Sequence, residues 1–368
     1  MPHADDPKSP EKAAPFARLS AEELITLNEE IAGMARAGLP LDQGLAALAR
    51  DLGRGRLQLV TAGIADGLRS GLTLPEAIER QGGRVPPYYS GLLLAGVRSG
   101  RLQDVLATLT LYARTLADLR STMLGALVYP AMVMVLSLAL VGFIFFFIMP
   151  QFEQIFEDFK IRLPAMTEVV FWIARHPVEL IIIPAGALGL VLGIVIVVAK
   201  SSHKGQMALA RFVYSLPIVG TLLRSARLAA FTDLLGILVD HQVPLPEALR
   251  LASQAVGDPL LRDAAGQAVA DLGGGVTLGQ TARARALVPD LVAWLIGLGE
   301  QRGSLGASLH QAAQMFRHRV EMRAVMLRNV VPPFVVIMTA GLLVTVFVFA
   351  VALPMFKLIE GLSGGLSL

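Results

Sequence analysis

The residue types most typical of a reactive site are two histidines near the carboxyl-terminal end, His310 and His318. They lie about two helical turns apart, so a helix would place them on one face. No carboxylate joins them in a metal-ligand motif such as HExxH, and the other histidines are scattered along the chain. We therefore expect both side chains to be solvated or to face a helix dipole, and we expect no metal site.

Two glycine-rich runs invite comparison with phosphate-binding loops. The run from Gly91 to Ser99 lacks the lysine that contacts the β- and γ-phosphates in a P-loop. It is also expected inside a helix rather than after a strand. The second run, 273–275, stands where a turn is expected. ATP hydrolysis by this chain is therefore not expected.

Glu300 is the acid of the segment GEQRG at 299–303, and Arg302 follows it closely. An isolated glutamate beside an arginine is usually an ion pair at a surface or between helices. The chain has no cysteine, which excludes disulfides, thiolate metal sites and a thiol nucleophile. These observations predict a protein that is not an enzyme and that uses no cofactor.

The composition indicates a membrane protein. Of the 368 residues, 54% are hydrophobic and 17% are charged, whereas soluble domains have about 45–50% apolar and about 25% charged residues. Three stretches without any charge, 121–152, 180–199 and 329–356, are long enough to span a bilayer as helices. The lack of ionisable residues in them argues against a transporter. The net charge of +3 is too small for the basic surface of a nucleic-acid-binding protein.

Charges beside the third stretch predict the topology. Arg317, Arg319, Arg323 and Arg328 precede it and only Lys357 follows it, so the positive-inside rule places its amino-terminal side in the cytoplasm. The amino terminus has no signal peptide and reads as a disordered tail. The expected order is a tail (1–20), a first cytoplasmic domain (21–120), a span (121–152), an external loop (153–179), a span (180–199), a second cytoplasmic domain (200–328), a span (329–356) and an external tail (357–368).

The soluble parts repeat each other. Leu39 to Leu41 recurs as Val243 to Leu245, and the segment 68–74 recurs as 272–278, both 204 residues later. The segment 96–102 recurs as 299–305, 203 residues later. Apolar residues recur at helical spacing in both copies, and strand-like alternation is absent outside the spans. The predicted fold is therefore an all-α membrane protein with two tandem six-helix cytoplasmic bundles and three transmembrane helices.

In this order, the motifs resemble the F-domain family of inner-membrane platform proteins from type II secretion and type IV pilus systems. The resemblance covers roughly 21–358. The residues that carry it are candidates for motif-borne interactions: Pro40, Leu41, Gly71, Gly96, Gly100, Leu102, Tyr129, Pro130, Pro150, Pro164, Thr167, Pro244, Leu245, Gly275, Gly299, Glu300, Gly303, Leu305, Pro333 and Pro354. The chain departs from the family pattern at Val97 and Arg98, where the family favours a glutamate, at Gln242 in place of a glycine, and at Pro333, which no tyrosine precedes.

The resemblance implies a multi-pass protein of the bacterial inner membrane with a cytoplasmic amino terminus. Its implied role is to couple a separate cytoplasmic secretion ATPase to the assembly of pilin-like subunits and to protein export. The implied partners are that ATPase, other inner-membrane platform proteins, pilin-like (pseudopilin) subunits, membrane lipid and further copies of the chain, without nucleic acid. A membrane-anchored helical scaffold or signalling protein unrelated to pili is the alternative that the residues leave open.

Overall fold

The computed structural model describes residues 18–158, 202–216, 219–285 and 287–356, with isolated positions between 168 and 197 and at 359. Regular structure within these segments is helical throughout, as the sequence predicts. Most of the expected span 180–199 lies outside the described residues, as do much of the expected loop 153–179 and nearly all of both tails. The span over 180–199 therefore stays a prediction.

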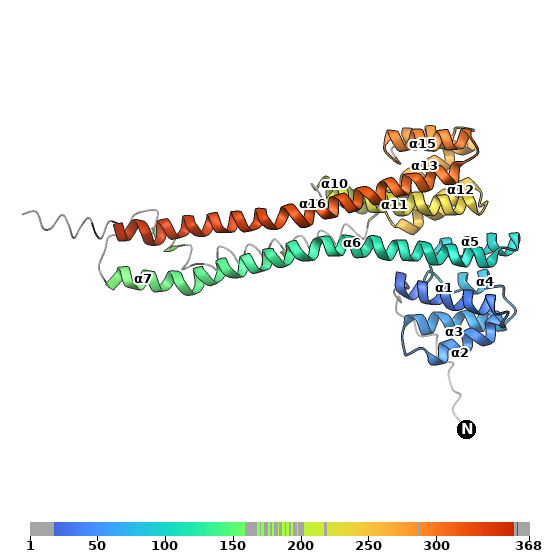
Figure 1. Cartoon of the computed structure of the whole chain (residues 1–368), viewed down its shortest axis with the longest axis horizontal. Helices are drawn as coiled ribbons and strands as arrows, with labels where there is room; N and C mark the ends of the chain where they lie inside the picture. Colours follow the sequence, from blue (N-terminus) through green and yellow to red (C-terminus); the bar gives the residue numbers. More distant parts are fainter. Residues whose placement is uncertain are drawn as a thin grey trace, which may run out of the picture. The chain divides into compact units, whose positions relative to one another are not determined.

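Equivalent helices form in the two copies, which we call the first and second repeat (Figure 1). Equivalent helices begin at the offset of the sequence repeat, as at Leu41 and Leu245 or at Leu102 and Leu305. The first repeat contains α1 (Ala21–Arg36), α2 (Leu41–Asp51), α3 (Arg56–Arg69), α4 (Leu74–Glu79), α5 (Pro87–Ser99) and α6 (Leu102–Phe143). The second contains α11 (Val219–Asp240), α12 (Leu245–Val256), α13 (Pro259–Gly273), α14 (Leu278–Ala284), α15 (Asp290–Gln301) and α16 (Leu305–Phe347). In the described residues between them in the chain, α7 (Met149–Asp158) and α10 (His203–Ser215) are also helical.

The helix ends have local causes that the sequence shows. Gly100 and Gly303 adopt φ values of 69° and 68°, the left-handed conformation expected where α5 and α15 end. The turn before α2 places Gly38 at φ 65°, and the equivalent turn before α12 holds Gln242 at φ 59°. Gln242 is the one non-glycine residue with positive φ among the described residues. The second repeat thus keeps the same turn although glutamine replaces the glycine. The glutamine must adopt a left-handed conformation, which strains the backbone at this residue.

The chain forms two compact units, the first made of residues 1–121 and 224–319. Its core is built from one apolar face of each helix: α1 buries Leu27 and Ile31, and α11 buries Leu234 and Leu238. These are pairs of residues four apart, the spacing of an amphipathic helix. Within this unit α2 packs on α3, α14 packs on α15, and α12 packs on α5. The last contact joins the second repeat to the first.

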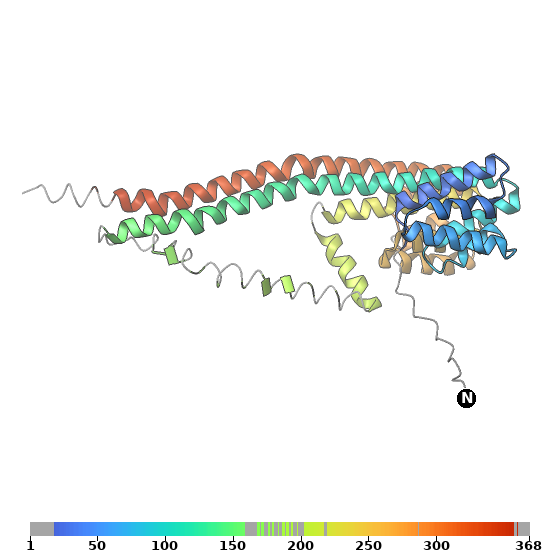
Figure 2. The ribbon, with the colours of Figure 1, turned by 90° about the horizontal axis from the view of Figure 1, so that it is seen from below.

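The second unit, residues 122–223 and 320–368, contains the apolar parts of α6 and α16. These parts lie side by side in both views (Figures 1 and 2). Two helices of the described segments, Leu102–Ile155 and Leu305–Phe356, are long and apolar enough to cross a membrane. They include the first and third expected spans, and their exposed faces carry large apolar side chains such as Leu136 and Ile337.

Each of these helices contains a short π-helical segment, η1 (Ile144–Ile148) after α6 and η3 (Val348–Ala352) after α16. Pro150 and Pro354 follow the two segments at the same distance. A proline lacks the backbone N–H and its ring clashes with the carbonyl four residues earlier. A local shift to wider π-type turns relieves this conflict without ending the helix. Around this point Met149, Phe171, Val346 and Ala350 form a buried apolar cluster.

Candidate functional site: a charged cluster in the second repeat

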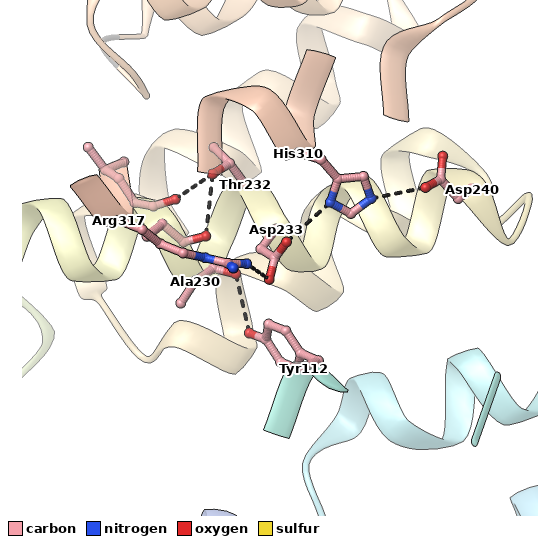
Figure 3. Close-up of polar contacts among 9 residues, drawn as sticks. Tyr112, Ala230, Thr232, Asp233, Asp240, His310 and Arg317 are labelled. Carbon is pink, nitrogen blue, oxygen red and sulfur yellow. Dashed lines mark hydrogen bonds and ion pairs between the residues drawn. The ribbon is translucent and has the colours of Figure 1, made fainter. Parts of the chain in front are cut away.

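A cluster of charged side chains lies where α11 and α16 face each other in the first unit. Asp233 and Asp240 are seven residues apart on α11, and His310 and Arg317 are seven residues apart on α16. Seven residues are about two helical turns, so each pair lies on one face of its helix. The packing of these two faces brings all four side chains together (Figure 3).

His310 lies between the two carboxylates. Its Nδ1 is 3.1 Å from Oδ1 of Asp233, and its Nε2 is 3.0 Å from Oδ2 of Asp240. Arg317 donates from Nη2 to the other oxygen of Asp233 at 2.5 Å. The side chain of Asp233 is only 8% exposed, and a buried carboxylate is stable only when it is paired and hydrogen-bonded. Arg317 and His310 provide that compensation.

Two carboxylates facing both ring nitrogens favour the doubly protonated imidazolium, which donates from each nitrogen. The hydrogen bond to Asp233 is the main cause that raises the pKa of His310, and the bond to Asp240 adds to it against the opposing effect of burial. For the neighbouring His241, at the end of α11, burial is the main cause and it lowers the pKa. The pKa values of the two histidines are thus shifted in opposite directions.

The first repeat closes the cluster from the side of α6. The hydroxyl of Tyr112 donates to the backbone carbonyl of Ala230 on α11 at 3.2 Å (Figure 3). The Tyr112 ring packs edge-on against Tyr88 of α5, with ring centroids 5.4 Å apart. A cavity of about 370 Å³ lies between α6 and the charged cluster, with Thr108 and Thr115 among its lining residues. Both repeats therefore contribute to this site.

The cluster connects two helices through ion pairs and hydrogen bonds. No group of three or more histidine, aspartate or glutamate side chains in the described part of the chain is arranged to hold a metal ion. The two carboxylates engage opposite nitrogens of one imidazole and do not converge on a common point. The arrangement fixes α16 against α11 by charge and links that contact to the protonation of His310.

The sequence predicted that His310 is solvated or faces a helix dipole. This prediction did not include a charged partner, whereas two carboxylates from α11 contact the imidazole directly. Sequence reasoning missed Asp233, Asp240 and Tyr112, and treated Arg317 only as a flanking charge of a span. The one signal in the sequence that could have indicated this cluster is the shared spacing of seven residues, between Asp233 and Asp240 and between His310 and Arg317. It becomes informative only when α11 and α16 are known to pack together.

Glu300, the acid of the GEQRG segment, makes a different contact from the expected ion pair. Its carboxylate accepts hydrogen bonds from the backbone N–H of Leu278 at 3.0 Å and of Gly279 at 3.2 Å. These are the first residues of α14, whose N–H groups have no partner within the helix. Glu300 on α15 therefore caps α14 from outside, and the favourable helix dipole adds to the effect.

The start of α4 in the first repeat is capped in a different way. Val97 stands at the position of Glu300, and Pro75, at the position of Gly279, has no N–H to donate. There Glu76 of α4 accepts from the backbone N–H of Thr73 at 2.8 Å in a capping box. In the first repeat the acidic side chain that caps this end therefore comes from α4 itself and serves the N-cap residue Thr73.

The motif glycines sit at close approaches and turns. A Cβ on Gly96 would lie 2.8 Å from Cγ2 of Val105, and a Cβ on Gly299 would overlap Ser308. Val105 and Ser308 are equivalent residues on the long helices, so each glycine lets α5 or α15 pack closely on the helix that follows. Gly71 and Gly275 adopt φ values of 89° and 84° in equivalent turns.

The other motif residues mark helix starts and helix interiors, and they do not form one site. Pro40 and Pro244 are the N-caps of α2 and α12, one residue before the helices that begin at Leu41 and Leu245. Tyr129 and Pro130 lie inside α6, and Pro333 lies inside α16, which both continue past them. Pro164 and Thr167 lie outside the described residues.

Comparison with known proteins gives one family. The model for protein F of the type II secretion system (T2SS) matches residues 29–150 and 231–354, one stretch in each repeat. The type IV pilus assembly protein TapC of Aeromonas hydrophila is 27% identical over 342 residues, which cover 93% of this chain and 83% of TapC. The type II secretion system protein F of Pseudomonas aeruginosa is 28% identical over 348 residues, covering 93% and 84%. The type IV pilus assembly protein PilC of the same species is 25% identical over 339 residues, covering 91% and 90%.

Proposed function

The chain belongs to the family of type II secretion system protein F, and from this premise we propose that it is an inner-membrane platform protein of a secretion or pilus-assembly machine. In this role it couples a separate cytoplasmic ATPase to the assembly of pilin-like subunits and to export. Its relatives carry the names of both kinds of system, type II secretion and type IV pilus assembly. The role is one of binding and transmission rather than catalysis.

The observation that supports this proposal most strongly is the match to both repeats together with the course of α6 and α16. Each of these helices begins in the charged part of its repeat, at Leu102 or Leu305. It then continues without a break into a segment that has no charged residue. Pro130 does not end α6, and Pro332 and Pro333 do not end α16. A continuous helix is a stiff element with a rise of about 1.5 Å per residue. Such an element passes a displacement of a cytoplasmic repeat to the membrane segment.

The proposed topology places both repeats and the amino terminus in the cytoplasm. The arginines before the charge-free part of α16, including Arg319, Arg323 and Arg328, support this orientation by the positive-inside rule. Because the chain lacks cysteine, single cysteines introduced at Gly53 and Gly273 report on sidedness without background. Labelling of either by a membrane-impermeant maleimide added outside intact cells would contradict the topology.

The coupling role is tested by Leu116→Pro in α6, with Leu116→Ala as the matched control. A proline in a helix interior removes a hydrogen bond and costs about 3 kcal/mol, so it breaks the stiff connection at this point. We expect the proline variant to reach the membrane in normal amount and to lose secretion or piliation, while the alanine variant keeps it. Normal export by the proline variant would show that the continuous helix transmits nothing.

Docking of the ATPase is tested separately with the full chain in detergent. The secretion ATPase of the same organism should co-purify with the chain, with an affinity that differs between the nucleotide-free and the ATP-bound forms. The Leu116→Pro variant should still bind, because its repeats are intact. Failure of the wild-type chain to bind the ATPase alone or together with its membrane partners would contradict direct or adaptor-mediated docking.

A further inference from the structure

Within the first unit, the second repeat places the turn before α12 against α5 of the first repeat. A Cβ built on Gly91 of α5 would lie 2.9 Å from Cδ1 of Leu251 on α12. Val243, in the turn, is only 8% exposed. Residues of α5 and of the turn together line one cavity of about 240 Å³. The face of α5 is therefore a binding surface for the turn 241–247 and the start of α12.

Among the described residues, nothing covers the equivalent surfaces of the two repeats. The repeat offset relates α15 to α5, and relates the turn 37–43 to the turn 241–247. Trp294 stands at the position of Gly91 and is 57% exposed, beside a groove of about 400 Å³ between α14 and α15. Leu39 stands at the position of Val243 and is 55% exposed. One chain thus presents one unused α15 face and one unused turn.

The residues at the two open surfaces differ from those at the internal contact in a reciprocal way. The internal contact sets the smallest residue, Gly91, against the large Leu251. At the open surfaces the equivalent residues are the large Trp294 and the small Ala47. A large side chain facing a small one preserves the filled volume that close packing requires.

The charged residues of the internal contact are also replaced in pairs at the open surfaces. Arg98 of α5 and Glu247 of α12, which have opposite charges, line the cavity of the internal contact. Their equivalents at the open surfaces are Gln301 and Gln43, which are both uncharged. A charge lost on one side without its counterpart would leave the other unpaired at an interface. Here both members are neutral.

We propose that the α15 face around Trp294 binds the segment 37–47 of a second copy of this chain, so that chains repeat between them the contact that α5 and α12 make within one. An exposed tryptophan beside a groove has the character of an interface anchor. The contact is heterologous, with different surfaces on the two chains, and so builds a ring or an open chain. The inference rests on the internal duplication and is independent of the proposed role in secretion.

Cross-linking of the full-length chain in nanodiscs tests this contact, because the native chain has no cysteine. We expect a short bismaleimide to join a Gln301→Cys chain to a Gln43→Cys chain as a dimer, and to produce a ladder from chains that carry both changes. Arg98→Cys with Glu247→Cys in one chain is the positive control, since it reports the internal contact as a mobility change without added mass. A homodimer formed by Gln301→Cys alone, or no product where the control reacts, would overturn the proposal.

A rescue experiment tests the pairing of side chains. Trp294→Gly on the Gln301→Cys chain should lower the dimer yield roughly tenfold or more, as expected for loss of an aromatic anchor. Ala47→Leu on the Gln43→Cys chain should lower it too, because leucine meets the tryptophan. The two changed chains together recreate the Gly91 and Leu251 pair and should regain the yield. An unchanged yield with either single change, or no recovery with both, would refute the contact, and circular dichroism confirms that each variant is folded.

Discussion

Oε2 of Glu300 accepts a hydrogen bond from the backbone N–H of Gly279 at 3.2 Å, and the first repeat has Val97 and Pro75 at the same two positions. Of the two donors to Glu300, the one equivalent to Gly279 is therefore lost together with the acceptor, while Leu74, equivalent to Leu278, keeps its N–H. This relationship explains why a glutamate is present in one repeat and absent from the other without damage to the fold. It also assigns Glu300 a role in the stability of α14.

Glu300→Ala should destabilise the second repeat by about 1–2 kcal/mol, the usual effect of losing a helix cap. Thermal unfolding of the purified chain, followed by circular dichroism, measures the change. The matched comparison is Val97→Glu, which should bring a smaller gain than Glu300 provides, because Pro75 offers no N–H and only the N–H of Leu74, equivalent to that of Leu278, is present. A gain from Val97→Glu as large as the loss from Glu300→Ala, or a neutral effect of Glu300→Ala, would contradict the capping role.

Gln242→Gly should stabilise the chain by up to about 1 kcal/mol, since a side chain in the left-handed region costs about that amount. Gly38→Ala, at the equivalent turn, should do the opposite and destabilise by a similar amount. Both are measured as shifts of the unfolding temperature. If both changes shifted it in the same direction, the backbone strain at Gln242 would not be the reason for its effect.

Asp233→Asn should cost about 3 kcal/mol, because it leaves the partly buried Arg317 without its counter-charge. Asp240→Asn provides the comparison, since Asp240 contacts the same histidine but its side chain is 52% exposed. An exposed pair contributes less than about 1 kcal/mol. Chemical denaturation of the two variants should therefore give clearly different losses, and equal losses would show that burial does not govern this cluster.

His310 makes stability depend on pH. Its raised pKa means that its contribution is complete below the ordinary value of about 6.5 and is lost as the pH rises through the raised value. His310→Gln should therefore destabilise the chain more at pH 6 than at pH 8, as seen in unfolding temperatures.

His241 provides the control with the opposite sign. Burial lowers its pKa, so its contribution is present above about 6.5 and is lost as the pH falls through the lowered value. His241→Gln should remove part of the stability loss at low pH. A pH profile unchanged by His310→Gln would mean that the two carboxylates do not hold the imidazolium.

The amino-acid sequence by itself determined the features that depend on short stretches of chain. Helical spacing of apolar residues, charge-free segments of sufficient length and glycines at helix ends predicted the all-helical fold, two helices long and apolar enough to cross a membrane, and the left-handed turns at Gly100 and Gly303. The offset between the repeats gave the duplication, which the equivalent helix starts confirm. These features are local because a helix and its caps are stabilised within a few residues.

Only the tertiary structure decided which distant groups meet. Glu300 had an arginine nearby in sequence, yet its partners are backbone groups more than twenty residues away. The contact of His310 with Asp233 and Asp240 depends on which faces of α11 and α16 pack together. Helical periodicity shows that a residue is on a given face, but it contains no information on which other face it meets. That choice is made by the packing of whole helices, and it brings charges that are far apart in the sequence together between α11 and α16.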